Sequence, residues 1–436
     1  MQKKQKVNIV WFRKDLRTTD QNSLTQATLG ELPVIALYCF DPSDFVTTRY
    51  GFKKTEKYRG KFLIESVTDL KKQLDEQNIP LVVKYASPVD AFHDLNKTLE
   101  IQNIFFQKEW TYEEKKVEKA VKNFLTETSF NSTYDQFLFH PYDVPYDSWR
   151  EIPEVFTEFR KNCQKHCTVR TLSRSPRPNQ KRPKINIDSS IPKLSDLGLE
   201  NFSVDHRSAF PFEGGSTSAR ERVEHYFWQT HKLRNYKKTR NGLLGTDYSS
   251  KLSAWLSNGS ISAREIYHEI VEFEDKVIKN QDTYWLIFEL IWRDYFKYIS
   301  LKHGNKIFKL NGLNRRHYNW KNDEDALNRW INGDTPEDFV NANMLEIKET
   351  GFMSNRGRQN VCSYWAKELK QDWRIGAAYF ESMLVDYDVH SNWGNWMYNS
   401  GVGNDPRDRK FNILLQAERY DAKYKYRQLW LQKLLL

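Results

Sequence analysis

The chain has 436 residues, 28% of them charged, and a formal net charge of +10. This length allows two or three hydrophobic cores, and the positive charge favours a polyanionic partner such as nucleic acid. No apolar run reaches the roughly 18 residues that a membrane-spanning helix needs, so we expect no membrane span.

The chain has only four cysteines: Cys39, Cys163, Cys167 and Cys362. The run Cys163–Cys167 looks like half of a zinc site, but no second half with ligand spacing follows it. We therefore expect no metal site, reduced thiols and a cytoplasmic location.

Residues 7–140 alternate between short β-rich runs and helical patterns. Helices are predicted at Lys57–Leu74 and Tyr112–Leu125, the second with Thr111 and Glu114 as a capping box. Strands are predicted at Val7–Phe12, Pro33–Phe40, Leu81–Tyr85, Ile104–Gln107 and Phe137–His140. This alternation predicts a doubly wound parallel sheet. No Gly-x-Gly-x-x-Gly follows the first strand, so dinucleotide binding in the usual manner of that fold is not expected there.

The composition changes after this region. Residues 170–197 are rich in Arg, Lys, Pro and Ser, which predicts a basic, extended linker. Beyond it strand signals almost vanish, and Ser218 with Glu221 and Ser262 with Glu265 predict capped helix starts. We therefore expect an α/β domain over residues 1–140, a linker over 141–212 and an all-α domain over 213–436.

A dense polar and aromatic cluster occupies Asp386–Trp396, with two carboxylates, amides and two indoles within eleven residues. Buried carboxylates and amides are unfavourable unless a partner satisfies them. The cluster therefore indicates a large, planar, polar ligand, although a Trp-rich turn on a helical domain is the simpler alternative.

A second candidate is the helical stretch Asp282–Ser300, which is apolar almost all round and should be buried. Trp285, Glu289 and Trp292 fall on one face of it. Glu289 either lines a pocket or simply pairs with Arg293, four residues later.

Two further segments have the chemistry of anion sites. Arg356 and Arg358 lie at a predicted helix start beside Gly357, which fits a phosphate or carboxylate clamp. The run Gly245–Ser253 supplies hydroxyl groups and a lysine before another helix, which fits a diphosphate.

Together these segments resemble the DASH-type cryptochromes of the photolyase/cryptochrome family. The resemblance rests on 236–245, Trp285–Asp294, Gly351–Asn360, Asp386–Trp396 and Gly401–Arg407, with Trp11–Arg17 and Cys39–Pro42 near the start. It implies an α/β antenna domain followed by an all-α domain that binds a U-shaped FAD, in a protein that we expect to be a monomer.

The resemblance also implies the cofactor contacts. The diphosphate region of FAD would be held by Tyr236, Ser249, Ser250, Leu252 and Ser253, and Lys251 and Arg293 would be further cofactor contacts. The isoalloxazine and ribose would be lined by Asn355, Arg358, Asp386, Asp388 and Asn392, with Arg358 paired to Asp386 and Asn392 facing the reactive central-ring nitrogen. A guanidinium beside the ring favours negative charge on a reduced flavin.

Trp396, Trp373 and Trp320 match the three-tryptophan electron relay of the family, although any one of the 14 tryptophans could be a core residue. The resemblance implies an antenna, 5,10-methenyltetrahydrofolate, which passes light energy to reduced FAD for electron donation to a pyrimidine dimer. Glu113 matches the folate-contacting glutamate, with Glu109 as the alternative.

The positions that would contact damaged DNA are Arg240, Glu289, Trp292, Asn355, Arg356, Gln359 and Tyr398. Tyr398 replaces a tryptophan and Gln359 a methionine of duplex-repair photolyases, so the pocket gains less stacking energy. Flipping a base out of a duplex costs a few kcal/mol, which single-stranded or looped DNA does not require. The resemblance thus implies repair of cyclobutane dimers mainly in single strands, with Glu289 stabilising the radical anion. A blue-light receptor without repair is the alternative, and repair of the 6-4 photoproduct ranks last because no histidine pair occupies the matched positions.

Overall fold

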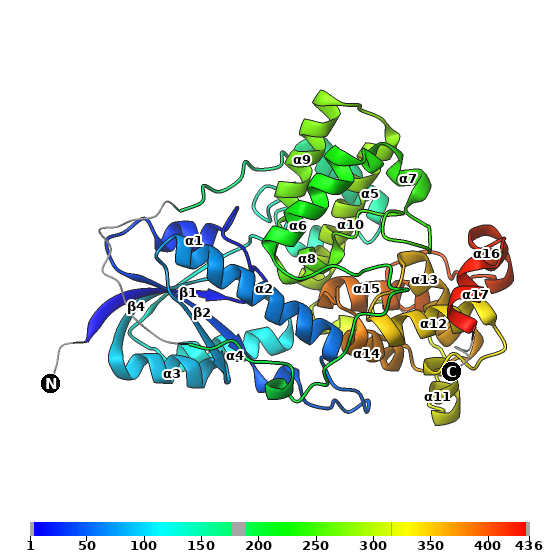
Figure 1. Cartoon of the computed structure of the whole chain (residues 1–436), viewed down its shortest axis with the longest axis horizontal. Coiled ribbons are helices and arrows are strands. Elements are labelled where there is room, and N and C mark those ends of the chain that lie inside the picture. Colours follow the sequence, from blue (N-terminus) through cyan, green and yellow to red (C-terminus); the bar gives the residue numbers. More distant parts are fainter. Residues whose placement is uncertain (1–3, 177–188, 315, 433–436) are drawn as a thin grey trace.

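The computed structural model describes residues 4–176, 189–314 and 316–432. Its N-terminal part is a five-stranded parallel sheet with the strand order β3-β2-β1-β4-β5 (Figure 1). The strands are β1 (Gln5–Phe12), β2 (Val34–Phe40), β3 (Leu81–Tyr85), β4 (Leu99–Gln107) and β5 (Ser129–Thr133). The helices are α1 (Asn22–Ala27), α2 (Lys57–Glu76), α3 (Pro88–Thr98) and α4 (Tyr112–Phe124). The predicted doubly wound fold is confirmed.

Alternation along β1 explains why helices cover both faces of the sheet. Val10 and Phe12 pack in one cluster with Leu70 of α2, whereas Ile9 and Trp11 pack in another with Phe92 of α3. Successive side chains of a strand point to opposite faces, so the uninterrupted apolar run 9–12 of β1 is buried on both sides.

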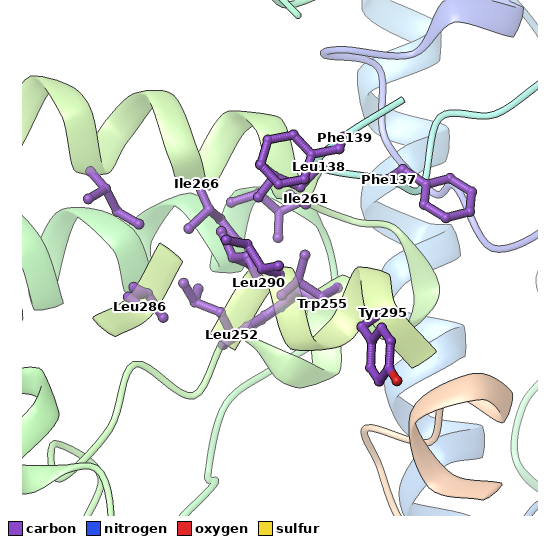
Figure 2. Packing of buried hydrophobic residues seen from close by; sticks show 14 of the residues in the cluster. Phe137, Leu138, Phe139, Leu252, Trp255, Ile261, Ile266, Leu286, Leu290 and Tyr295 are labelled. Atoms are coloured by element: carbon purple, nitrogen blue, oxygen red, sulfur yellow. The ribbon is translucent and has the colours of Figure 1, made fainter. Parts of the chain in front are cut away.

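The fifth predicted strand, Phe137–His140, is wrong, and the polar segment β5 takes its place in the sheet. The apolar residues Phe137, Leu138 and Phe139 instead lie among the helices of the C-terminal part (Figure 2). The backbone N–H groups of Leu138 and Phe139 donate to the buried carboxylate of Asp294, 2.8 to 3.0 Å away. A buried apolar run therefore finds its backbone partner on a helix side chain, a pairing that periodicity cannot reveal.

Two of the three predicted capping boxes are also wrong. Thr111 makes no side-chain cap bond, and the Glu114 carboxylate, which would complete the box, pairs with Lys14 at 2.7 Å instead. The helix expected after Ser218 begins at Ser216, because Asp69 of α2 accepts from the backbone N–H of Thr217. At Ser262 only the cap is confirmed: its hydroxyl oxygen accepts from the backbone N–H of Glu265 at 2.9 Å, while the Glu265 carboxylate pairs with Arg220.

The described residues after Thr133 form helices and irregular segments, as predicted. The first group is α5 (Phe156–His166), α6 (Ser216–Val223), α7 (Tyr236–Thr239), α8 (Ser253–Asn258), α9 (Ala263–Lys276) and α10 (Gln281–His303). The second is α11 (Glu324–Ile331), α12 (Asp338–Thr350), α13 (Asn355–Ser363), α14 (Trp373–Met383), α15 (Val389–Ser400), α16 (Ile413–Tyr420) and α17 (Lys425–Leu431). Each group surrounds its own aromatic-rich core, and α2 reaches from the sheet toward both (Figure 1).

The predicted linker over residues 141–212 contains α5 in its first part. Its most basic stretch, residues 177–188, lies outside the described residues, so the proposed domain boundaries stay a prediction. In the part of the chain that the structure describes, no helix combines the length and the apolar character that crossing a membrane requires.

Candidate cofactor and substrate site

A cavity that is open to solvent lies between α13, α14 and α15 and encloses about 470 Å³, open solvent included. Seven of the residues predicted from the sequence line it: Asn355, Arg358, Gln359, Asp386, Asp388, Asn392 and Trp396. The structure thus brings together two sequence segments about 30 residues apart. We call this space the central cavity.

The start of α13 places two of these residues. Ser354 caps the helix by accepting from the backbone N–H of Gly357 at 3.0 Å, which puts Asn355 and Arg358 on its first turn. A side chain at position 357 would collide with Asn343 of α12, since a Cβ there would lie 1.9 Å from the Asn343 Oδ1 atom. Only glycine allows α13 to approach α12 this closely.

Arg358 pairs with Asp386 in the cavity wall. One guanidinium nitrogen donates to both carboxylate oxygens at 2.9 Å, while Nε donates to the Met353 carbonyl oxygen at 2.9 Å. The Asp386 side chain is only 2% exposed, against 24% for Arg358. The carboxylate therefore fixes the guanidinium, which keeps an exposed edge for a ligand.

Asp388 is buried in the same wall and is satisfied on both sides. One carboxylate oxygen caps α15 by accepting from the Ser391 N–H at 2.8 Å, and the other accepts from Lys297 Nζ of α10 at 3.0 Å. Burial by itself would raise the pKa of Asp388, but the charges of Lys297 and Arg293 hold that pKa well below its usual range. Lys297 was missed by the sequence reading, because nothing local links it to a residue 91 positions away.

Asparagine amides form a neutral polar strip on α15. Asn392 Nδ2 donates to the Ala377 carbonyl oxygen of α14 at 3.0 Å, which fixes the orientation of its amide. Asn395 and Asn399 each donate to the carbonyl oxygen four residues earlier and also line the central cavity. The strip therefore offers hydrogen bonds without adding charge.

The loop before α8 is held by a residue that the sequence reading also missed. Arg222 of α6, with its side chain 2% exposed, donates to the carbonyl oxygens of Thr246, Ser249 and Ser250 and to the Asp247 carboxylate. These hydrogen bonds fix the backbone conformation at Ser249 and Ser250, just before α8 begins at Ser253.

Lys251 in this loop is almost fully buried, and its ammonium lies 3.2 Å from the ring centroid of Tyr248 and 4.6 Å from that of Phe352. Among the described residues it has no hydrogen-bond partner, and burial lowers its pKa well below the usual value. A buried ammonium without an oxygen partner is costly, and an anionic ligand would relieve that cost. Leu252, by contrast, points into the apolar core (Figure 2).

Of the predicted substrate residues, Asn355 and Gln359 line the central cavity, and Arg240 pairs with Glu289 outside that lining. Arg240 Nη2 and Glu289 Oε1 are 2.8 Å apart, with the side chains 16% and 26% exposed. Burial raises the pKa of Glu289, although the Arg240 charge opposes that rise. The alternative pairing of Glu289 with Arg293 is wrong, because Arg293 donates to the carbonyl oxygens of Gln136 and Leu256. Tyr236 is buried next to this pair.

Arg356 and Gln359 join this pair to the cavity. Arg356 donates to Gln359 Oε1 at 2.9 Å and to Asn241 Oδ1 at 3.2 Å, and Gln359 lines the cavity. The Arg356 guanidinium also lies over the ring of Tyr420 on α16, 4.6 Å from its centroid. Tyr420 had no sequence signal, since its role depends on a helix more than 60 residues further along the chain.

Trp292 and Tyr398 are the two aromatic residues among the predicted substrate contacts. Their rings meet edge to face with centroids 5.9 Å apart, and Phe156 of α5 stacks on Trp292 at 3.6 Å. We call Arg240, Glu289, Arg356, Gln359, Trp292 and Tyr398 the mouth of the cavity.

The three relay tryptophans differ in burial. Trp396 lines the cavity, Trp373 is fully buried, and Trp320 is half-buried. Trp373 contacts Trp393 with ring centroids 5.7 Å apart, and Trp320 contacts Tyr318 at 5.0 Å. Their role in electron transfer stays a prediction.

The two antenna candidates lie in different surroundings. The Glu113 side chain is 67% exposed and pairs with Lys54 at 2.6 Å. Glu109 is 4% exposed and accepts from Gln107 Nε2 at 2.8 Å. Glu113 is therefore more accessible to a bound molecule than Glu109, and it stays the preferred candidate for the antenna contact.

The residues present fit FAD. The lone Lys251 ammonium and the loop held by Arg222 suit a diphosphate, while the asparagine strip and the Arg358–Asp386 pair suit a polar ring system. Within the described ranges no group of three His, Cys, Asp or Glu side chains could hold a metal ion.

Comparison with known proteins agrees with this geometry. The family model described as DNA photolyase matches residues 8–181, and that of the FAD binding domain of DNA photolyase matches residues 285–435. A cryptochrome DASH of Gloeobacter violaceus is 45% identical over 98% of this chain and 86% of its own length, and that of Xenopus laevis is 43% identical over 98% and 83%. The crystal structure of a Synechocystis cryptochrome superimposes with a TM-score of 0.93 at 40% identity, covering 99% of this chain and 89% of that one. The chain belongs to the cryptochrome DASH group of the DNA photolyase family, and its helical part is an FAD-binding domain.

Proposed function

We propose that the protein repairs cyclobutane pyrimidine dimers in single-stranded or looped DNA under blue light. The observation that carries this proposal is the half-buried Glu289–Arg240 pair, which Asn241, Arg356 and Gln359 connect to a cavity suited to FAD. When bound, reduced FAD supplies one electron under illumination and recovers it after the dimer has split.

The chain's own residues hold that cofactor. The Arg358–Asp386 pair and Lys251 would bind its anionic parts, and Asn392 would present a fixed amide to the ring. Asp388, locked by Lys297 and by the start of α15, keeps Asn392 in place one turn later. Because these bonds fix the orientation of the side chains, binding needs little reorganisation.

At the mouth, Glu289 would hydrogen-bond the dimer and stabilise negative charge on it, since burial raises its pKa. Arg240 and Arg356 would bind the phosphates beside the lesion, and Trp292 and Tyr398 would contact the extruded bases. Tyr398 offers a smaller stacking face than tryptophan, which supports the preference for DNA that needs no unpairing.

Trp396, Trp373 and Trp320 would supply electrons that return an oxidised cofactor to its reduced state. Glu113 would contact a 5,10-methenyltetrahydrofolate antenna. All four cysteines are free thiols in the structure, which supports a reducing compartment, and we place the protein in the cytoplasm as part of this proposal.

Signalling without repair is the second candidate. The intact FAD-binding domain favours light sensing as much as repair, because both need only the cofactor and its relay. A receptor would not need the Glu289–Arg240 pair, which separates the two functions.

The test is light-dependent repair of dimer-containing oligothymidylate by Glu289→Ala, with bound FAD measured in parallel. Repair should fall on the order of 100-fold while FAD content stays near that of the wild type. The matched control is Glu269→Ala, which removes a half-buried Glu–Trp bond of 3.0 Å on α9, away from the cavity. Equal losses of FAD and of repair in Glu289→Ala would make Glu289 structural, and no repair by the FAD-loaded wild type would favour the receptor.

A further inference from the structure

Trp396, which lines the central cavity, also contacts a tryptophan outside the predicted relay, Trp330 of α11. Its ring meets that of Trp330 edge to face, with centroids 6.2 Å apart. Trp330 in turn lies 4.8 Å from Trp365, with the two ring planes 33° apart. Three indoles thus form a continuous contact that leads from the cavity into the core.

The fold isolates Trp330 and Trp365 from solvent. Trp330 is the one fully buried residue of α11, and it packs on Tyr379 and parallel to Phe380 of α14. Trp365 follows α13 and is equally buried, at 0% exposure. The chain of indole contacts therefore ends inside the protein at Trp365. In the predicted outward relay, by contrast, Trp320 is half-buried.

The indole N–H groups of the two residues face no base. Trp365 Nε1 donates to the Asp372 carbonyl oxygen at 3.0 Å, and a peptide carbonyl is a poor proton acceptor. Trp330 Nε1 is buried and, in the described part of the structure, has no hydrogen-bond partner. An indole that loses an electron here would keep its proton, so the oxidation would be readily reversed.

We propose that Trp330 and Trp365 form a buried side branch of the electron relay, which shares the positive charge left on Trp396 and holds it away from the cavity. This rests on the proposed function. Trp396 gives one electron to light-excited oxidised FAD, and one electron then passes from Trp330 or Trp365 to Trp396. The indole pair is oxidised, Trp396 is restored, no proton moves, and the charge returns by the same route unless Trp373 supplies an electron to Trp396.

The kinetic test uses a Trp373→Phe background, in which the outward route is blocked. In the FAD-loaded protein, the tryptophan radical formed by a light flash should decay several-fold faster when Trp330→Phe is added, because the charge then stays on Trp396 beside the cofactor. Adding Trp365→Phe instead should also make the radical decay faster. This second double variant serves as the test if the one with Trp330→Phe folds poorly. Trp255→Phe, at another fully buried indole in the other core, should leave the decay unchanged.

A second readout needs no cofactor. Two indoles in contact couple their ultraviolet transitions, so the apoprotein should show an exciton couplet in circular dichroism. Trp330→Phe and Trp365→Phe should each remove the same couplet, and Trp255→Phe should retain it.

An unchanged or slower radical decay in both double variants would overturn the side branch, as would a couplet that survives either single substitution. Neither result would affect repair by reduced protein, so the proposed function would stand. If the wild type binds FAD but forms no tryptophan radical after a light flash, both the predicted relay and the side branch are contradicted.

Discussion

The inner wall and the mouth of the cavity hold their charges in different ways. In the inner wall, Asp386 and Asp388 are nearly inaccessible and each is paired with a cation, Arg358 or Lys297. At the mouth, Glu289 and Arg240 keep 26% and 16% of their side-chain surface exposed, and Arg356 has a buried Nε without a partner among the described residues. The difference indicates that the inner wall is fixed by its own ion pairs, whereas the charged groups of the mouth can exchange partners.

Breaking an inner-wall pair should have the largest effect. Asp388→Ala strands the Lys297 ammonium, which is 4% exposed, and removes the cap of α15. Loss of one partner of a buried pair costs about 3–5 kcal/mol, so the free energy of unfolding in urea should fall by about that amount. Asp388→Asn, which keeps a capping oxygen, should lose less. A loss below about 1 kcal/mol in Asp388→Ala would show that the inner wall is no more rigid than the mouth.

The second prediction concerns Glu346 of α12, whose charge lies near Lys251. Burial raises its pKa from 4.5 to about 7. Because the folded state then binds more protons than the unfolded state between these values, stability should fall as pH rises through this window. Glu346→Gln removes that loss.

Relative to the wild type, Glu346→Gln should gain roughly 2 kcal/mol in unfolding free energy between about pH 5 and about pH 8. Urea unfolding of both proteins at several pH values measures the gain. Parallel stability curves would mean that Glu346 keeps an ordinary pKa in the fold.

The third prediction probes the mouth. Arg240→Met removes the charge that opposes the raised pKa of Glu289, so that pKa should rise further. The limb of the pH–repair profile that reports Glu289 should move to higher pH by about one unit, which corresponds to about 1.4 kcal/mol. A pH–repair profile that does not shift would show that the Arg240 charge does not influence the titration of Glu289.

The smallest effect is expected for Tyr398→Trp, which enlarges the stacking face beside Trp292. Aromatic pairs contribute about 0.5–1.5 kcal/mol beyond burial, so affinity for a dimer should rise several-fold in duplex and in single-stranded DNA alike, because the added stacking energy contributes to binding of both. Binding measured on both DNAs checks this. No gain on either DNA would argue against contact between position 398 and the extruded bases.

The sequence predicted the elements that depend on local patterns. The first four strands and α10 follow from alternation and helical spacing, and the start of α13 was predicted beside Gly357. Long-range partners could not be predicted in this way. Phe137–His140 was taken for a strand because its true backbone partner, Asp294, is more than 150 residues away.

The same limit applies to the site. The resemblance to the family supplied Arg358, Asp386 and Asn392, which the structure brings to one cavity. The residues that hold them in place, such as Lys297 and Arg222, are buried cations whose partners are 24 to 91 positions away. No local spacing marks such residues.

The central claim is that FAD lies in the cavity against Trp396. Fluorescence of bound FAD tests it most directly, because an indole in contact with the ring quenches its emission by electron transfer. Bound FAD should be almost dark in the wild type and should regain emission in Trp396→Phe but not in Trp255→Phe. FAD that binds stoichiometrically with the same emission in the wild type and in Trp396→Phe would contradict the account.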